Sequence, residues 1–183
     1  PEQFRKTPLI IAGDKTFPPF EYLDDRGFPI GFNVELTKEI MNRLGITNYK
    51  IILNDWDDII NDYQKGKIDL IMGMMYTKER AEKYNFGPSH GSVYQDIIYR
   101  KGTSPIKSLS ELSGKKILVE RSSINSDILI ENGFKEDLLP QDNAIVALKM
   151  LSEGKGDAVV CDHEMAVFLI YKLGYSNLEI SDI

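Results

Sequence analysis

The first side chain that could do chemistry follows a short apolar run near the start of the chain. Residues 9–12 are apolar, as expected of a strand that is covered on both faces, and Asp14 comes at its carboxyl end. Open α/β sheets bind their ligands at that end of the strands. A carboxylate in this position therefore indicates a small-molecule site.

Aromatic side chains surround a rigid dipeptide immediately after this carboxylate. Phe17 precedes Pro18-Pro19, and Phe20 follows it. The fixed φ of proline holds the neighbouring rings in place at little entropic cost, and Tyr22 continues the aromatic pattern. The loop predicts an aromatic wall for a ligand. The alternative is that the rings only cover the end of a core.

Further binding groups occur at the ends of later predicted strands, each with a plainer alternative. The Arg80 guanidinium could bind a carboxylate in bidentate fashion, or it could form a surface ion pair. Ser122 and Ser123 open a helix, where hydroxyl and N–H groups bind anions, although either serine could simply cap that helix. Asp162 could attract an ammonium group or cap the next helix, and Trp56 could be a second aromatic wall or a core anchor.

These groups have complementary chemistry when they are taken together. The first half of the chain supplies aromatic rings, an acid and an arginine, and the second half supplies an anion site and an acid. Such a set suits a zwitterion that carries an α-carboxylate and an α-ammonium group.

Catalytic and metal-binding motifs are scarce. His90 and His163 are far apart and lack metal-ligand spacing, so we expect a loop role for the first and a helix-start role for the second. No nucleophile elbow, phosphate loop or dinucleotide fingerprint is present. Glu21 and His90 are the only loose candidates for an acid or base. We expect neither enzymatic activity in this domain nor a metal or cofactor, and we expect the single Cys161 to be buried and inert.

Composition excludes several other classes of function. The chain has 183 residues, of which 42% are hydrophobic and 27% charged, with a net charge of −6 and scattered basic residues. This balance argues against nucleic acid and against an anionic membrane surface as partners. No apolar run approaches the roughly 18–20 residues of a membrane helix. Because the chain begins at Pro1 without an initiator Met, we expect a processed protein or an excised piece.

Apolar periodicity predicts alternating strands and helices, and hence an α/β fold with mainly parallel sheets. Asn33 is the expected N-cap of the first helix. The expected strands cover residues 9–12, 49–53, 68–72, 93–99, 116–120, 157–161 and 178–180. The expected helices cover residues 34–44, 56–64, 77–82, 123–132, 144–153 and 164–173.

An internal echo predicts two lobes of similar construction. Residues 64–72 and 152–160 both read as a helix end, a Gly-Lys-x-Asp turn and a buried strand. We expect Asp69 and Asp157 to begin their strands and to tie the turns together. Two lobes joined by a thin hinge would form a cleft. The predicted first lobe, hinge and second lobe cover residues 1–99, 100–104 and 105–183.

Three ordered motifs resemble the extracytoplasmic solute-binding proteins of the amino-acid type, and the resemblance covers residues 9–180. The motifs are residues 17–22 with Gly27 and residues 31–36; residues 67–69 through 77–80 to 84–86; and residues 109–116 through Ser122 and Ser123. The family implies a two-lobed type II periplasmic binding fold. In that family the chain normally returns from the second lobe to the first, so the end at Ile183 is read as an incomplete return.

The resemblance also implies how the ligand side chain would be held. Phe17 and Trp56 would sandwich it, and Asp14 would lie near its far end. The segment from Gly73 to Met75 would offer backbone groups. This segment is one residue shorter than usual and lacks the serines and threonines that often line it.

The α-groups of the ligand are assigned in the same way. Arg80 with Ser122 and Ser123 would bind the α-carboxylate, and Asp162 would bind the ammonium group. Arg121 stands where the family usually has glycine, and Asn33 replaces its usual aspartate.

The resemblance implies an extracytoplasmic domain that closes on an amino acid or similar small carboxylate. The short, Met-rich segment after Gly73 resembles family members fused to sensor histidine kinases, so a membrane-embedded kinase is the expected partner. The alternative is the binding protein of an ABC amino-acid transporter, which is presented to a permease. An enzyme of the dehydratase or lyase type and a structural domain without ligand are further alternatives.

Overall fold

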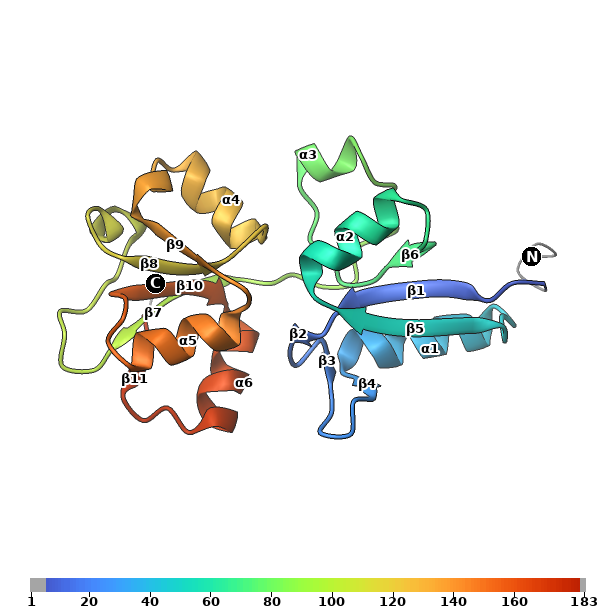
Figure 1. The fold of residues 1–183 in the computed structure, drawn as a ribbon, viewed down its shortest axis with the longest axis horizontal. Helices are drawn as coiled ribbons and strands as arrows, with labels where there is room; N and C mark the ends of the chain where they lie inside the picture. The colour runs from blue at the N-terminus through green and yellow to red at the C-terminus, as the bar shows by residue number, and fades with distance from the viewer. Residues whose placement is uncertain (1–5, 182–183) are drawn as a thin grey trace. The chain divides into compact units, whose positions relative to one another are not determined.

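The computed structural model describes residues 6–181, which divide into two compact units on either side of the Pro88–Ser89 bond. Each unit is an α/β structure, as the sequence predicts (Figure 1).

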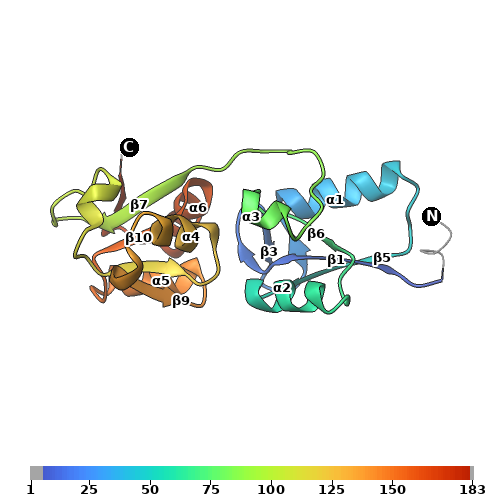
Figure 2. The same cartoon turned by 90° about the horizontal axis from the view of Figure 1, so that it is seen from above.

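A parallel sheet forms the centre of the first unit. Its strands are β1 (Leu9–Asp14), β5 (Tyr49–Asn54) and β6 (Leu70–Ile71), in the order β5-β1-β6. The helices α1 (Phe32–Arg43) and α2 (Trp56–Gln64) lie on opposite faces of this sheet (Figure 2). The central strand β1 is therefore covered on both sides.

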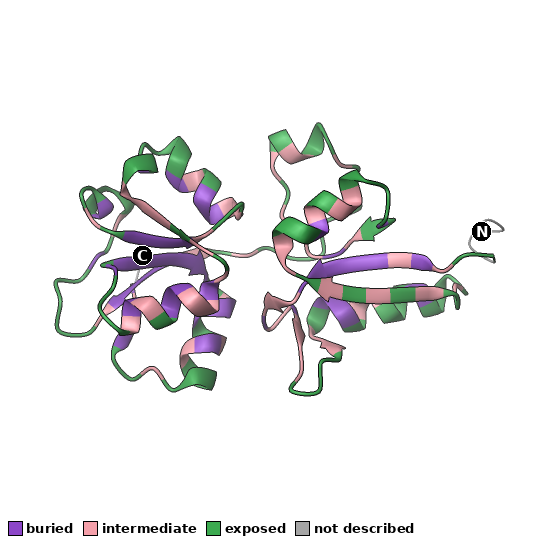
Figure 3. Ribbon diagram, in the orientation of Figure 1, coloured by how far each residue is buried: buried purple, intermediate pink, exposed green. Residues whose placement is uncertain are grey.

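The side chains of β1 alternate between the two helices. Leu9 and Ile11 pack in one cluster with Met41 of α1, whereas Ala12 packs in another with Ile59 of α2. This two-sided burial explains why the strand reads as an uninterrupted apolar run, and most of β1 is drawn as buried in Figure 3.

A small antiparallel sheet builds the aromatic loop. It contains β2 (Thr16–Phe17), β3 (Glu21–Leu23) and β4 (Pro29–Ile30). The sequence predicts only a loop here, because strands of two or three residues are too short to show a hydrophobic period. The pairing places Phe17 opposite Glu21.

The prediction that Asn33 caps α1 is wrong. The helix begins at Phe32 with Gly31 in the N-cap position, and Asn33 lies buried in the first turn. Its side-chain amide donates a hydrogen bond to Oε2 of Glu21 at 3.0 Å. The amide therefore satisfies a buried carboxyl group instead of the helix end.

One five-stranded sheet forms the centre of the second unit. Its order is β11 (Leu178–Ile180), β7 (Gln95–Arg100), β10 (Ala158–Asp162), β8 (Ile117–Glu120) and β9 (Leu138–Gln141). Strand β7 runs antiparallel to β10 and β11, whereas β10, β8 and β9 are parallel. The sheet is thus mixed, and not mainly parallel as expected, because β7 enters it from the first unit.

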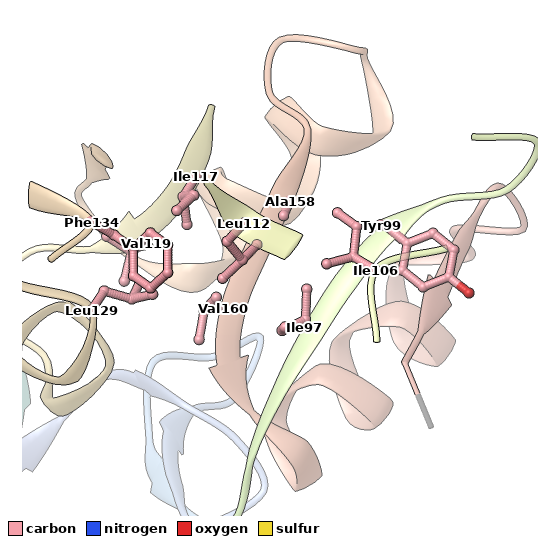
Figure 4. Close-up of a cluster of buried hydrophobic side chains, with 10 residues drawn as sticks. All are labelled: Ile97, Tyr99, Ile106, Leu112, Ile117, Val119, Leu129, Phe134, Ala158 and Val160. Atoms are coloured by element: carbon pink, nitrogen blue, oxygen red, sulfur yellow. The ribbon is translucent and has the colours of Figure 1, made fainter. Parts of the chain in front are cut away.

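Helices cover both faces of this sheet. In Figure 1, α4 (Ile124–Glu131) lies on one face, and α5 (Ala144–Ser152) and α6 (His163–Leu173) lie on the other. Short helical turns occur at α3 (Lys78–Ala81) in the first unit and at η2 (Leu109–Leu112) and η3 (Lys135–Asp137) in the second. The core on the α4 face is shown in Figure 4 and consists of Ile97, Tyr99, Ile106, Leu112, Ile117, Val119, Leu129, Phe134, Ala158 and Val160.

Strand β7 also moves the boundary between the units. The sequence assigns residues 1–99 to the first lobe and residues 100–104 to a hinge, but β7 pairs with β10 and β11 in the second sheet. The compact units accordingly meet near Pro88, about a dozen residues before the predicted hinge. The apolar pattern of a strand does not specify its pairing partners, so the sequence could not assign β7 to a unit.

The prediction that Asp69 and Asp157 tie their turns is confirmed, and both do so in the same way. Oδ2 of Asp69 accepts the N–H of Ile10 at 2.7 Å, and Oδ2 of Asp157 accepts the N–H of Lys116 at 2.8 Å. Each aspartate also donates its own N–H to the carbonyl of the same residue, at 2.9 Å in both units. The internal echo is therefore a repeated link between neighbouring parallel strands.

We expect Asp69→Ala and Asp157→Ala each to lower the free energy of unfolding by about 1 kcal/mol, because a strand-edge N–H loses a charged acceptor. Chemical denaturation followed by circular dichroism measures this change, with the exposed Asp25→Ala as control. Losses no larger than that of the control would show that the two turns do not depend on these carboxylates.

Candidate functional site

The candidate contacts of the first unit follow the carboxyl ends of its parallel strands. Asp14 ends β1, Trp56 begins α2 just after β5, and Gly73 and Met75 follow β6. Parallel strands end at the same edge of a sheet, so the fold brings these residues to one edge of the unit.

Arg80 lies against Trp56 in this unit. Its guanidinium carbon is 5.8 Å from the centre of the Trp56 ring, and one guanidinium N–H donates to the carbonyl of Met75 at 3.3 Å. Thr77 caps α3 as predicted, since its hydroxyl accepts the N–H of Arg80 at 3.0 Å. Trp56 is only partly buried, which excludes the role of a fully buried core anchor.

Phe17 packs against Phe20 in the aromatic loop. The ring centroids are 5.0 Å apart with an interplanar angle of 35°, and both side chains are partly buried. One part of each residue is therefore held by the protein while another part stays accessible. This arrangement fits a wall at the edge of a site.

Asp14 is buried to 7% exposure but divides its carboxylate between two environments. Oδ1 accepts the N–H and the hydroxyl of Thr16, at 2.6 and 2.8 Å, whereas Oδ2 has no hydrogen-bond partner within residues 6–181. Burial raises the pKa of Asp14, and the two bonds from Thr16 oppose this effect. Nearby, Lys15 pairs with Asp55 at 2.6 Å.

Glu21 is enclosed almost completely, with 1% exposure. Oε1 accepts the N–H of Asp14 at 2.9 Å, and burial raises the pKa of Glu21 to about 8. Such an enclosed carboxyl group is poorly placed to act on a ligand, which weakens its candidacy as a catalytic acid or base. His90, the other candidate, lies in an exposed segment between α3 and β7.

The central group of the second unit is Asp162, which ends β10 and is 3% exposed. It occupies the N-cap position of α6, but its side chain does not cap that helix. Instead, Oδ1 accepts the side-chain amides of Gln95 at 3.3 Å and Asn125 at 3.4 Å. Burial raises its pKa to about 6; the two amides lower it and the charge of Glu164 raises it.

The two candidate serines have different surroundings. Ser123 caps α4, because its Oγ accepts the N–H of Ser126 at 3.2 Å and donates to the carbonyl of Glu120 at 2.8 Å. The capping alternative is thus confirmed for Ser123. Ser122 is exposed and has a φ of 55°, in the left-handed region that most side chains avoid. Arg121 forms an ion pair with Asp142.

The strand order brings the candidate groups of the second unit to one edge. Strands β8 and β10 are adjacent and parallel, so Ser122 and Ser123 follow the same sheet edge at which Asp162 lies. Sequence reasoning missed Gln95 and Asn125, the two residues that hold Asp162. Gln95 could not be found, because its place depends on the antiparallel pairing of β7, whereas Asn125 is a buried amide just inside a predicted helix.

Other polar groups have structural surroundings. His163 begins α6, and its Nδ1 lies 2.5 Å from Oδ2 of Asp96. Cys161 is buried, and burial raises the pKa of its thiol well above the usual value, as expected of an inert cysteine. Within residues 6–181 no cluster of three or more His, Cys, Asp or Glu side chains could hold a metal ion. None of the helices in that range has the length and apolar character needed to cross a bilayer.

Comparison with known proteins places these features in one family. The sequence model of the bacterial extracellular solute-binding proteins, family 3, matches residues 9–165. The L-cystine-binding protein TcyJ of Escherichia coli K12 is 26% identical over 166 residues, which cover 90% of this chain and 62% of TcyJ. The chain thus spans less than two thirds of the length of this relative.

Solved structures agree with this assignment. A histidine kinase sensor domain with similarity to periplasmic binding proteins has a TM-score of 0.92 and 30% identity, over 94% of this chain and 75% of that one. The holo form of ArgBP from T. maritima has a TM-score of 0.87 and 31% identity, over 99% of this chain and 80% of that one. The type II periplasmic binding fold expected from the sequence is therefore confirmed.

We expect Asp162→Asn to raise the free energy of unfolding at pH 7.5 by about 1–2 kcal/mol, because the variant removes a buried charge. The pKa of Asp162 is about 6 in the folded protein and 3.8 in its usual range, so its charge destabilises the protein as pH rises through this interval. The gain should disappear near pH 4. Urea denaturation at both pH values, with the exposed Glu136→Gln as control, tests this; an equal gain at both would refute it.

Proposed function

Because the chain belongs to the bacterial extracellular solute-binding proteins of family 3, we propose that it binds an amino acid or similar small carboxylate outside the cytoplasm. Contacts would come from both units, and a ligand held by both would stabilise a closed state through its higher affinity for that state.

The observation that carries this proposal is the environment of Asp162. The helix after it would be stabilised by a capping side chain, yet its buried carboxylate faces two side-chain amides instead. A buried charge is costly unless a partner of opposite charge is supplied, and the ammonium group of an amino acid is such a partner. Arg80 beside Trp56 offers the opposite charge for the α-carboxylate.

The ligand side chain would meet the first unit. Phe17 and Trp56 supply aromatic surface, and Oδ2 of Asp14 offers an acceptor that the protein itself leaves without a partner within residues 6–181. Backbone groups between Gly73 and Met75 would complete this part of the site.

We further propose that the domain senses its ligand for a membrane-bound histidine kinase. Its likeness to a histidine kinase sensor domain over 94% of the chain supports this role, as does the short segment after Gly73. The alternative is the binding protein of an ABC transporter, which the likeness to an arginine-binding protein supports. In membranes from the source cell, a ligand-dependent change in autophosphorylation supports sensing, whereas ligand uptake lost on gene deletion supports transport.

We expect an L-amino acid panel that includes arginine, glutamine and cystine to contain a ligand that raises the stability of the full-length protein. A ligand at 100 times its Kd should add about 2.7 kcal/mol. Asp162→Ala and Arg80→Ala should each weaken binding by roughly 10–100-fold, because each removes a charge-assisted hydrogen bond. Thermal shift and calorimetry measure these effects, with Glu136→Gln and Arg26→Ala as exposed controls. Absence of any response across the panel would contradict the proposal.

The affinity should also fall at acidic pH. The pKa of Asp162 is about 6, and only its ionised form attracts an ammonium group, so protons compete with the ligand below that value. We expect the Kd to rise by about tenfold between pH 7 and pH 5 in the wild type. Asp162→Asn should bind weakly with a flat profile over this range. A wild-type Kd that stays constant down to pH 5 would exclude Asp162 as the ammonium ligand.

A further inference from the structure

Glu21 touches three separate segments of the first unit. Its Oε1 accepts the N–H of Asp14 at the end of β1, at 2.9 Å. Its Oε2 accepts the side-chain amide of Asn33 in the first turn of α1, at 3.0 Å. Across the β2–β3 pairing, Glu21 is directly opposite Phe17. One carboxyl group therefore links β1, α1 and the aromatic loop.

Two glycines let this carboxyl group pass between backbones. A Cβ on Gly13 would lie 2.6 Å from Oε1 and 2.8 Å from Cδ of Glu21. A Cβ on Gly73 would lie 2.6 Å from Oε2, and the φ of Gly73 is +72°, which also favours glycine. Glu21 thus packs directly on the segment after β6, from which Gly73 and Met75 would meet a ligand.

The charges around Glu21 are few. Burial is the main cause that raises its pKa to about 8, and the nearby Asp14 carboxylate adds to this effect. The bonds from the Asp14 N–H and from Asn33 act in the opposite direction. From β1 the group that faces Glu21 is Asp14, from α1 it is the neutral Asn33, and from the segment after β6 it is Gly73.

We propose that Glu21 is a positioning residue of the ligand site. Its carboxyl group sets the positions of Asp14, Phe17 and the segment from Gly73 to Met75 relative to one another. This inference rests on the proposed function and adds a residue that would not itself touch the ligand. A shift of Glu21 would move every candidate contact on these segments together.

A double-mutant cycle tests whether the carboxyl group and Gly13 are packed as described. Gly13→Ala should lower the midpoint of thermal unfolding by roughly 5 °C or more, because its methyl group collides with Glu21. In Gly13→Ala/Glu21→Ala the methyl group meets no carboxyl, so this variant should be no less stable than Glu21→Ala. Additive losses would overturn the proposal. Gly87→Ala, where the added Cβ meets open space, is the matched control.

Titration distinguishes positioning from simple packing. The Asp14 N–H donates to Glu21, so its amide NMR signal should shift with a midpoint near pH 8 in the wild type and not in Glu21→Gln. The signal of Gly73 should follow the same midpoint. Amide signals that do not respond at either position would overturn the proposal, and this readout needs no ligand.

Binding provides the functional readout. Glu21→Ala should weaken the binding of the amino acid identified in the panel by roughly tenfold, the equivalent of one lost hydrogen bond, with Glu21→Gln closer to the wild type. Glu35→Gln on the exposed face of α1 is the control. Wild-type affinity in Glu21→Ala would overturn the proposal. If the wild-type protein binds no amino acid, the proposed function fails, while the cycle and the titration still decide the role of Glu21.

Discussion

Buried carboxylates at the ends of parallel strands are the constraint on which the rest of this structure depends. Asp14, Glu21 and Asp162 are each less than a tenth exposed, and burial raises the pKa of all three. Removing a charge from water is costly unless donors or an opposite charge replace the solvent. The neighbouring segments supply donors: Thr16 for Asp14, the Asp14 N–H and Asn33 for Glu21, and Gln95 and Asn125 for Asp162.

The two units solve the same construction problem and then diverge. Each uses an aspartate after a Gly-Lys-x turn to tie one parallel strand to its neighbour, Asp69 in the first unit and Asp157 in the second. The strand that follows ends differently, at Gly73 beside a cationic Arg80 helix in the first unit and at Asp162 in the second. The repeat thus places opposite charges on equivalent strand ends, which is the arrangement that a zwitterion requires.

The sequence predicts those parts of the fold that depend on local patterns. The helix Trp56–Gln64 and the Thr77 cap are correct, because apolar period and capping chemistry are local. Parts that depend on distant partners are not predictable in this way: the strands β2 to β4 and β9, the antiparallel course of β7, and the place of Asn33 beside Glu21. The candidate site divides similarly, since Asp162 is visible from its strand whereas Gln95 is not.

The N-terminus of α6 shows why stability alone does not account for this site. An aspartate in the N-cap position ordinarily stabilises a helix by about 1 kcal/mol when its side chain accepts an N–H of the first turn. Asp162 occupies that position, but its carboxylate turns to Gln95 and Asn125 and stays buried with a pKa near 6. The protein therefore loses the cap and also carries a partly desolvated charge at neutral pH. A cationic group that binds there would offset both costs, which makes this corner of the second unit more favourable with a ligand than without one.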